Sequence, residues 1–69
     1  ILFPNPVDDV LYIDAVKGEE YEYQLYNVAG QLLKSGKFNQ DQLDVSSLTK
    51  GVYIIRVNQS EKVFKIIKK

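Results

Sequence analysis

The chain has 69 residues and a mass of 7.9 kDa. This is enough for one small domain, because a chain of about this length buries only roughly 60% of the surface that it exposes when unfolded. Hydrophobic residues make up 45% of the chain and charged residues 26%, a composition that is typical of a globular protein and excludes a disordered one. Nine basic residues balance nine acidic ones, so no net charge draws the chain to nucleic acid or to an anionic membrane.

Four residue types are missing, since the sequence contains no His, Cys, Met or Trp. Their absence removes the commonest general base, the commonest metal ligand, any thiol nucleophile and every disulfide. We therefore expect a domain that is not an enzyme, binds no cofactor or metal, and gains its stability from packed sheets. No apolar run approaches the roughly 18 residues that span a bilayer, so we expect no membrane insertion. Because the chain starts without methionine or an export signal, we expect it to be a piece of a larger protein.

Alternating apolar and polar residues predict strands in the N-terminal half, and no stretch has the periodicity of a helix. The expected strands are residues 10–13, 21–25 and 31–34. Two prolines, Pro4 and Pro6, favour extended backbone at the residue before each of them, ahead of the strand at residues 10–13. A polar turn at residues 17–20 follows the first strand. Asn27–Gly30 is predicted to close a hairpin as a type I turn with Gly30 in the left-handed region.

The second half continues the pattern with three further strands, at residues 43–45, 52–57 and 62–67. Breaks are predicted at Ser35-Gly36 and at residues 39–41, on either side of a short piece near Phe38, and corners at residues 46–51 and 58–61. Six or seven short antiparallel strands at a spacing of roughly ten residues predict an all-β sandwich with Greek-key connections. A small barrel is the alternative that the same spacing allows.

Tyr53 lies in the pattern Leu48-x-x-Gly51-x-Tyr53, which resembles a tyrosine corner. In such a corner the tyrosine hydroxyl bonds to the backbone a few residues upstream, so the expected role of Tyr53 is structural. Gly51 and Gly30 are expected where φ is positive or where backbone approaches closely. Neither belongs to a glycine-rich phosphate-binding motif, because the chain contains none.

Charged residues are unevenly distributed even though they sum to zero. Residues 1–34 carry six acids and two bases (−4), and residues 35–69 carry seven bases and three acids (+4). The pairs Asp8-Asp9 and Glu19-Glu20 lack the spacing of a calcium loop and are expected to be solvated turn carboxylates. Four of the eight lysines fall in the last eight residues: Lys62, Lys65, Lys68 and Lys69. They either keep an edge strand from pairing with another chain or form a charged address for a receptor.

Four segments in register resemble the C-terminal sorting domains of the type IX (Por) secretion system. They are Phe3-Pro4-Asn5-Pro6-Val7, residues 25–33, residues 43–54, and the basic end at residues 62–69. The resemblance covers nearly the whole chain. It implies an immunoglobulin-like sandwich occupying residues 1–69 at the end of a larger secreted protein of Bacteroidota-type bacteria.

The resemblance also implies a function and partners. The domain would direct an N-terminal cargo through the periplasm and the outer membrane of a Gram-negative bacterium, using an outer-membrane translocon. A sortase-like surface peptidase would then remove the domain and attach the cargo at the cell surface. The residues that match the family pattern, and that we expect the machinery to recognise, are Gly51, Val52, Tyr53, Lys65, Lys68 and Lys69.

A second hypothesis, a carbohydrate-binding or adhesive module of a secreted enzyme, stays open at this point. It would use the exposed faces of tyrosine rings, because aromatic rings stack on sugars. The candidates are Tyr12, Tyr21, Tyr23 and Tyr26. Packing in the core or between strands is the alternative role of these four rings.

Overall fold

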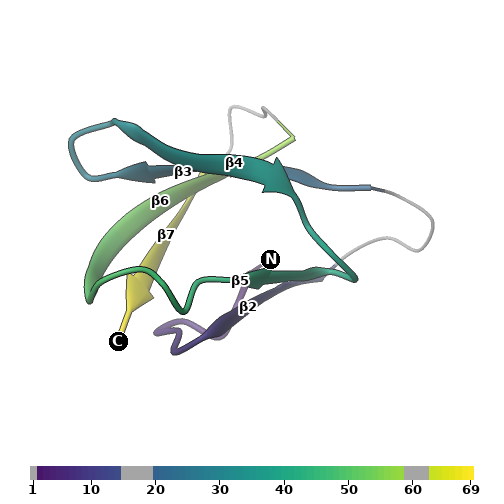
Figure 1. Cartoon of the computed structure of the whole chain (residues 1–69), viewed down its shortest axis with the longest axis horizontal. Coiled ribbons are helices and arrows are strands. Elements are labelled where there is room, and N and C mark those ends of the chain that lie inside the picture. Colours follow the sequence, from purple (N-terminus) through teal and green to yellow (C-terminus); the bar gives the residue numbers. More distant parts are fainter. Residues whose placement is uncertain (1, 15–19, 59–62) are drawn as a thin grey trace.

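Two antiparallel sheets form the molecule in this computed structural model, which describes residues 2–14, 20–58 and 63–69 (Figure 1). Sheet A has the strand order β1-β2-β5, formed by Leu2–Phe3, Val10–Ile13 and Gln42–Asp44. Sheet B has the order β4-β3-β6-β7, formed by Leu32–Lys37, Glu22–Asn27, Gly51–Val57 and Val63–Lys68. The predicted all-β sandwich of six or seven strands is therefore confirmed, with seven strands formed, and the barrel is not formed.

The strand order is that of an immunoglobulin-like domain. Strands β1, β2 and β5 share one sheet, and β3, β6 and β7 share the other, as the A, B, E and C, F, G strands do in that fold. Strand β4 extends the second sheet beyond β3. No helix that could cross a membrane occurs in the described parts of the chain.

The core lies between the sheets and is built by the alternation that the sequence predicts. Leu11 and Ile13 on β2 face Leu25 on β3 and Ile55 on β6, and all four side chains are buried. Residues between them in sequence point away from the core, because successive side chains of a strand alternate faces. Among the described residues, the other buried apolar side chains are Leu2, Val7, Tyr23, Leu43, Val45, Tyr53 and Ile66.

The hairpin between β3 and β4 has the predicted geometry. Gly30 has a φ of 86°, and its N–H donates to the carbonyl oxygen of Asn27 (3.0 Å). The side chain of Asn27 fixes the turn, because its Oδ1 accepts hydrogen bonds from the N–H groups of Ala29 (2.9 Å) and Gln31 (3.0 Å). Asn27 thus acts as the turn-forming side chain that its position in the sequence suggests.

One prediction about the strands was wrong, and one strand was not predicted. Ser35-Gly36 does not break the chain but continues β4 to Lys37. Gly36 lies opposite Tyr23 in the ladder, where a Cβ would make van der Waals contact with the Tyr23 ring (3.4 Å from its hydroxyl oxygen), so this glycine is a strand residue packed beside a ring and not a turn residue. The short strand β1 was also not predicted. It forms because its two residues pair with Tyr12 and Ile13 of β2, a contact that local patterning cannot show.

The remaining turns agree with the sequence where the structure describes them. Gln40 and Asp41 both have positive φ (54° and 62°) between the mutually bonded Asn39 and Gln42, as a two-residue hairpin turn requires. Phe38 is not a separate strand but packs its ring edgewise against Tyr23 at 5.6 Å. The predicted turns at residues 17–20 and 58–61 lie mostly outside the described residues.

Candidate functional site

Tyr53 forms the predicted tyrosine corner at the start of β6. Its hydroxyl donates a hydrogen bond to the carbonyl oxygen of Thr49, four residues upstream, at 2.7 Å. The Thr49 hydroxyl lies 3.1 Å from the same Tyr53 oxygen and completes the contact. Gly51, between them, has the positive φ that was expected (156°). The Tyr53 ring is buried, so the corner fixes the position at which β6 enters sheet B.

The residues that match the sorting-domain pattern come together at one end of sheet B. Strands β6 and β7 pair so that Gly51 lies opposite Lys68, and Val52 lies opposite Ile67. The end of β7 therefore runs beside the start of β6, next to the C-terminus in Figure 1. Segments more than ten residues apart in sequence thus form one surface.

The three matched lysines do not share one environment. Lys65 and Lys69 are exposed, whereas Lys68 is only 7% exposed and its Nζ donates to the carbonyl oxygen of Lys69 at 3.0 Å. The difference follows from strand alternation, since Lys68 shares the inward face with Ile66. Of the three lysines that we expect the machinery to recognise, Lys68 is therefore not accessible as a free cation.

Strand β7 is an edge strand of sheet B, and the N-terminal segment covers part of its outer edge. The Asn5 side chain bonds it twice, because its Nδ2 donates to the carbonyl oxygen of Lys65 (3.1 Å) and its Oδ1 accepts from the N–H of Ile67 (2.9 Å). Val7 continues the contact through its backbone, donating to the Ile67 carbonyl (2.8 Å) and accepting from the Lys69 N–H (2.9 Å). Residues 5–7 thus take the place of a neighbouring strand.

Sequence reasoning missed this role of Asn5. It used the two prolines at positions 4 and 6 only as evidence for an extended segment. The signal that was available is the asparagine between them, since an amide side chain carries the same donor and acceptor as a peptide group. The partner strand, about sixty residues away, could not be identified from the chain.

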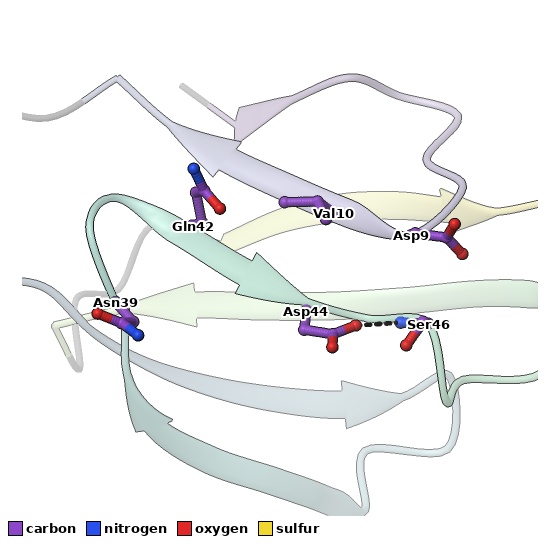
Figure 2. A pocket seen from close by; sticks show the side chains of 6 residues that line it. All are labelled: Asp9, Val10, Asn39, Gln42, Asp44 and Ser46. Atoms are coloured by element: carbon purple, nitrogen blue, oxygen red, sulfur yellow. Dashed lines mark hydrogen bonds between the residues drawn. The ribbon is translucent and has the colours of Figure 1, made fainter.

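A polar hollow of about 480 Å³ lies on the other sheet and contains none of the matched residues (Figure 2). Its lining residues are Asp9, Val10, Asn39, Gln42, Asp44 and Ser46. Hydrogen bonds from the Ser46 side chain and backbone lower the pKa of Asp44, and the Ser46 N–H lies 2.8 Å from Asp44 Oδ1. The Asp44 carboxylate is therefore charged at neutral pH.

Carboxylates do not assemble into a metal site in the part of the chain that the structure describes. No group of three or more carboxylate, imidazole or thiol side chains is placed to share an ion there. Asp8 and Asp9 are exposed, as expected for turn carboxylates. Glu20 is exposed as well and lies 3.4 Å from Lys37 Nζ, while Glu19 falls outside the described residues.

The four tyrosines proposed for sugar binding do not lie on one face. Tyr23 is buried in the core, where burial raises the pKa of its hydroxyl, and Tyr21 packs against the core. Tyr26 lies on the outer face of sheet B, with the Arg56 guanidinium 5.9 Å from its ring centre. Tyr12 is exposed on the outer face of sheet A. A binding surface built from all four rings is therefore not formed.

Fold and surface together define a small immunoglobulin-like sandwich with a basic strand at one edge and no metal-binding cluster among its described residues. A family model described as the secretion system C-terminal sorting domain matches residues 1–69. The chain belongs to this family, the C-terminal sorting domains of the type IX secretion system. No curated protein and no solved structure matches the chain. The family is one of sorting signals, not of enzymes.

We predict that Tyr53→Phe lowers the free energy of unfolding by about 1 kcal/mol, because it removes the hydroxyl that satisfies the Thr49 carbonyl. Denaturant unfolding measures this. Tyr26→Phe is the matched control, since Tyr26 is only half-buried on the outer face of sheet B. Equal midpoints for Tyr53→Phe and the parent would show that ring packing alone matters.

We predict that Asn5→Ala accelerates amide hydrogen exchange at Ile67 and destabilises the domain by about 1 kcal/mol. The substitution removes the acceptor of the Ile67 N–H and the donor to the Lys65 carbonyl.

Asn39→Ala is the control for the exchange measurement, because Asn39 is an exposed asparagine beside sheet A, away from β7. Unchanged exchange at Ile67 in Asn5→Ala would contradict the role assigned to Asn5.

Proposed function

We propose that this chain is the C-terminal signal of a larger secreted protein and that the secretion machinery recognises it as a folded sandwich with a basic edge strand. Its membership of the sorting-domain family means that it serves a cargo that the type IX system delivers outside the cell or to its surface. The proposal adds that residues 1–69 act as one domain at the end of that cargo protein. It also adds that the signal leads to attachment at the cell surface.

The recognition proposal rests on the hydrogen bonds that the outer edge of β7 already makes. Its outer backbone edge is already bonded to Asn5 and Val7 over residues 65–69. A receptor strand could add there only by displacing the N-terminal segment. Side chains that project from the strand remain accessible, and we therefore propose recognition by side-chain contact.

The six matched residues divide into two roles in this proposal. Lys65 and Lys69 are exposed cations, and Val52 is 37% exposed beside Ile67, so these side chains make direct contact. Gly51, Tyr53 and Lys68 hold the surface in shape, through the corner, the buried ring and the bond from Lys68 Nζ to the Lys69 carbonyl. An acidic or carbonyl-rich receptor surface is the complement of such a patch.

The partners follow from the same proposal. The folded domain reaches the periplasm, docks on an outer-membrane translocon, and is removed by a sortase-like surface peptidase after export. Neither nucleic acid nor insertion into the bilayer has a place in this route. Among the described residues, Asp8 pairs with the tail, and its Oδ2 lies 4.0 Å from Lys69 Nζ. Both side chains are mostly exposed, so this pair leaves Lys69 free to contact a receptor.

Charge reversal at Lys65 and Lys69 tests the proposal better than removal of the tail does. Ile66 is buried, so deleting residues 66–69 would disrupt the core as well as the signal. We predict that a periplasmic reporter fused to the chain is secreted, and that Lys65→Glu/Lys69→Glu reduces secretion about tenfold or more. Fractionation of reporter between periplasm, cell surface and medium measures this.

The control has the same change of charge at the opposite edge of sheet B. Lys34 and Lys37 lie on β4 and are exposed, so Lys34→Glu/Lys37→Glu should leave secretion unchanged. Circular dichroism and thermal unfolding of both purified variants establish that they remain folded. Normal secretion of the folded Lys65→Glu/Lys69→Glu fusion would refute recognition through these side chains.

A further inference from the structure

The outer face of sheet A carries an exposed aromatic pair. Phe3 on β1 and Tyr12 on β2 are register partners, and their rings stack with centres 5.7 Å apart and planes inclined by 23°. Phe3 is 47% exposed and Tyr12 is 38% exposed. Their neighbours Leu2, Leu11 and Ile13 on the same strands are buried, so the two rings lie on the face away from the core. The pair therefore offers an apolar platform to solvent.

The polar hollow adjoins this platform. Gln42 on β5 is the register partner of Tyr12, and Asp44 is the register partner of Val10. Register partners in antiparallel strands place their side chains about 5 Å apart on the same face. The row Phe3, Tyr12, Gln42 thus leads from two aromatic rings directly into the hollow shown in Figure 2.

The hollow contains hydrogen-bonding groups of a particular kind. Asp9, Asp44, Asn39 and Gln42 supply carboxylate and amide groups, and Ser46 supplies a hydroxyl. All five of these polar residues are exposed to solvent, and within the hollow the Ser46 N–H donates a hydrogen bond to Asp44 Oδ1 (Figure 2). A volume of about 480 Å³ lies within the roughly 300–1,000 Å³ of sites that hold small ligands.

An aromatic platform beside amide and carboxylate groups matches the chemistry of a sugar. One face of a pyranose ring presents C–H groups that pack on aromatic rings, while its hydroxyls form paired donor and acceptor contacts that planar polar side chains can satisfy. The lining includes two carboxylates and no Lys or Arg. Charge complementarity therefore favours neutral or amino sugars and disfavours uronic acids and other anionic sugars.

We propose that the outer face of sheet A binds a glycan of neutral or amino sugars, stacked on Phe3 and Tyr12 and hydrogen-bonded by Gln42, Asp44 and Asn39. This site differs from the earlier tyrosine hypothesis in using only Tyr12 of the four tyrosines, together with Phe3. It also lies on the sheet that does not carry Lys65 and Lys69. The glycan-binding proposal and the sorting proposal therefore concern separate surfaces, and an experiment can refute either one without the other.

The test is an NMR titration of the ¹⁵N-labelled chain with four tetrasaccharides: cellotetraose, N-acetylchitotetraose, chitosan tetramer and tetragalacturonate. The expected result is binding of at least one of the first three with a Kd below about 10 mM, with shifts centred on Tyr12, Gln42 and Asp44. Tetragalacturonate should bind at least about tenfold more weakly. Tyr12→Ala and Phe3→Ala should each weaken binding about tenfold.

Matched variants separate stacking from other effects. Tyr12→Phe keeps the ring and should bind like the parent, while Tyr26→Ala removes an aromatic ring from the opposite sheet and should also leave binding unchanged. Gln42→Ala tests the hydrogen-bonding half of the site without touching the rings and should weaken binding. Absence of binding by the three favoured saccharides, shifts centred on sheet B, or unchanged binding by folded Tyr12→Ala would each overturn the proposal.

Discussion

The contact between the N-terminal segment and β7 is the interaction on which the arrangement of this domain depends. An edge strand exposes a row of unpaired N–H and carbonyl groups and invites pairing with other chains. Here the Asn5 side chain and the Val7 backbone satisfy the outward groups at Lys65, Ile67 and Lys69. The last strand is consequently held in the sheet at both edges near its end, with β6 on one side. A tail that could hang free is instead part of the folded surface.

This constraint explains why only part of the functional surface could be predicted from the sequence. Local patterning located β2, β6 and β7 well, because it depends only on neighbouring residues. The Tyr53 corner was predictable for the same reason, since donor and acceptor lie four residues apart. Asn5, β1 and Gly36 were not, because each serves a partner far away in sequence. Residue type alone does not distinguish Lys68 from Lys65 and Lys69, but the alternation of side chains along β7 turns Lys68 toward the inside.

The two sheets have different surfaces, and we assign them different roles. The end of sheet B combines exposed Lys65 and Lys69 with a strand edge that is already occupied, which favours recognition of a preformed shape. The outer face of sheet A combines the Phe3–Tyr12 pair with a polar hollow, and this combination favours a sugar, which has both C–H faces and hydroxyl groups. Neither surface needs bond-making chemistry. The core occupies only the space between the sheets, so the outer faces stay available. A domain of this size can therefore have two recognition surfaces.

Recognition of the folded state can be tested most directly by locking β7 in place. Val52 and Ile67 are register partners, and the Ile67 N–H and carbonyl bond to Asn5 and Val7 rather than to β6. Such a pair has Cα atoms about 4.5 Å apart, within the range that a disulfide bridges, and the chain contains no other cysteine. Both redox states of the Val52→Cys/Ile67→Cys chain lack the Val52 side chain, so the loss of that contact is common to both, and a reporter fused to this chain should be secreted equally well with the disulfide formed or reduced. Secretion only in the reduced state would show that the strand must leave the sheet, and would contradict our account.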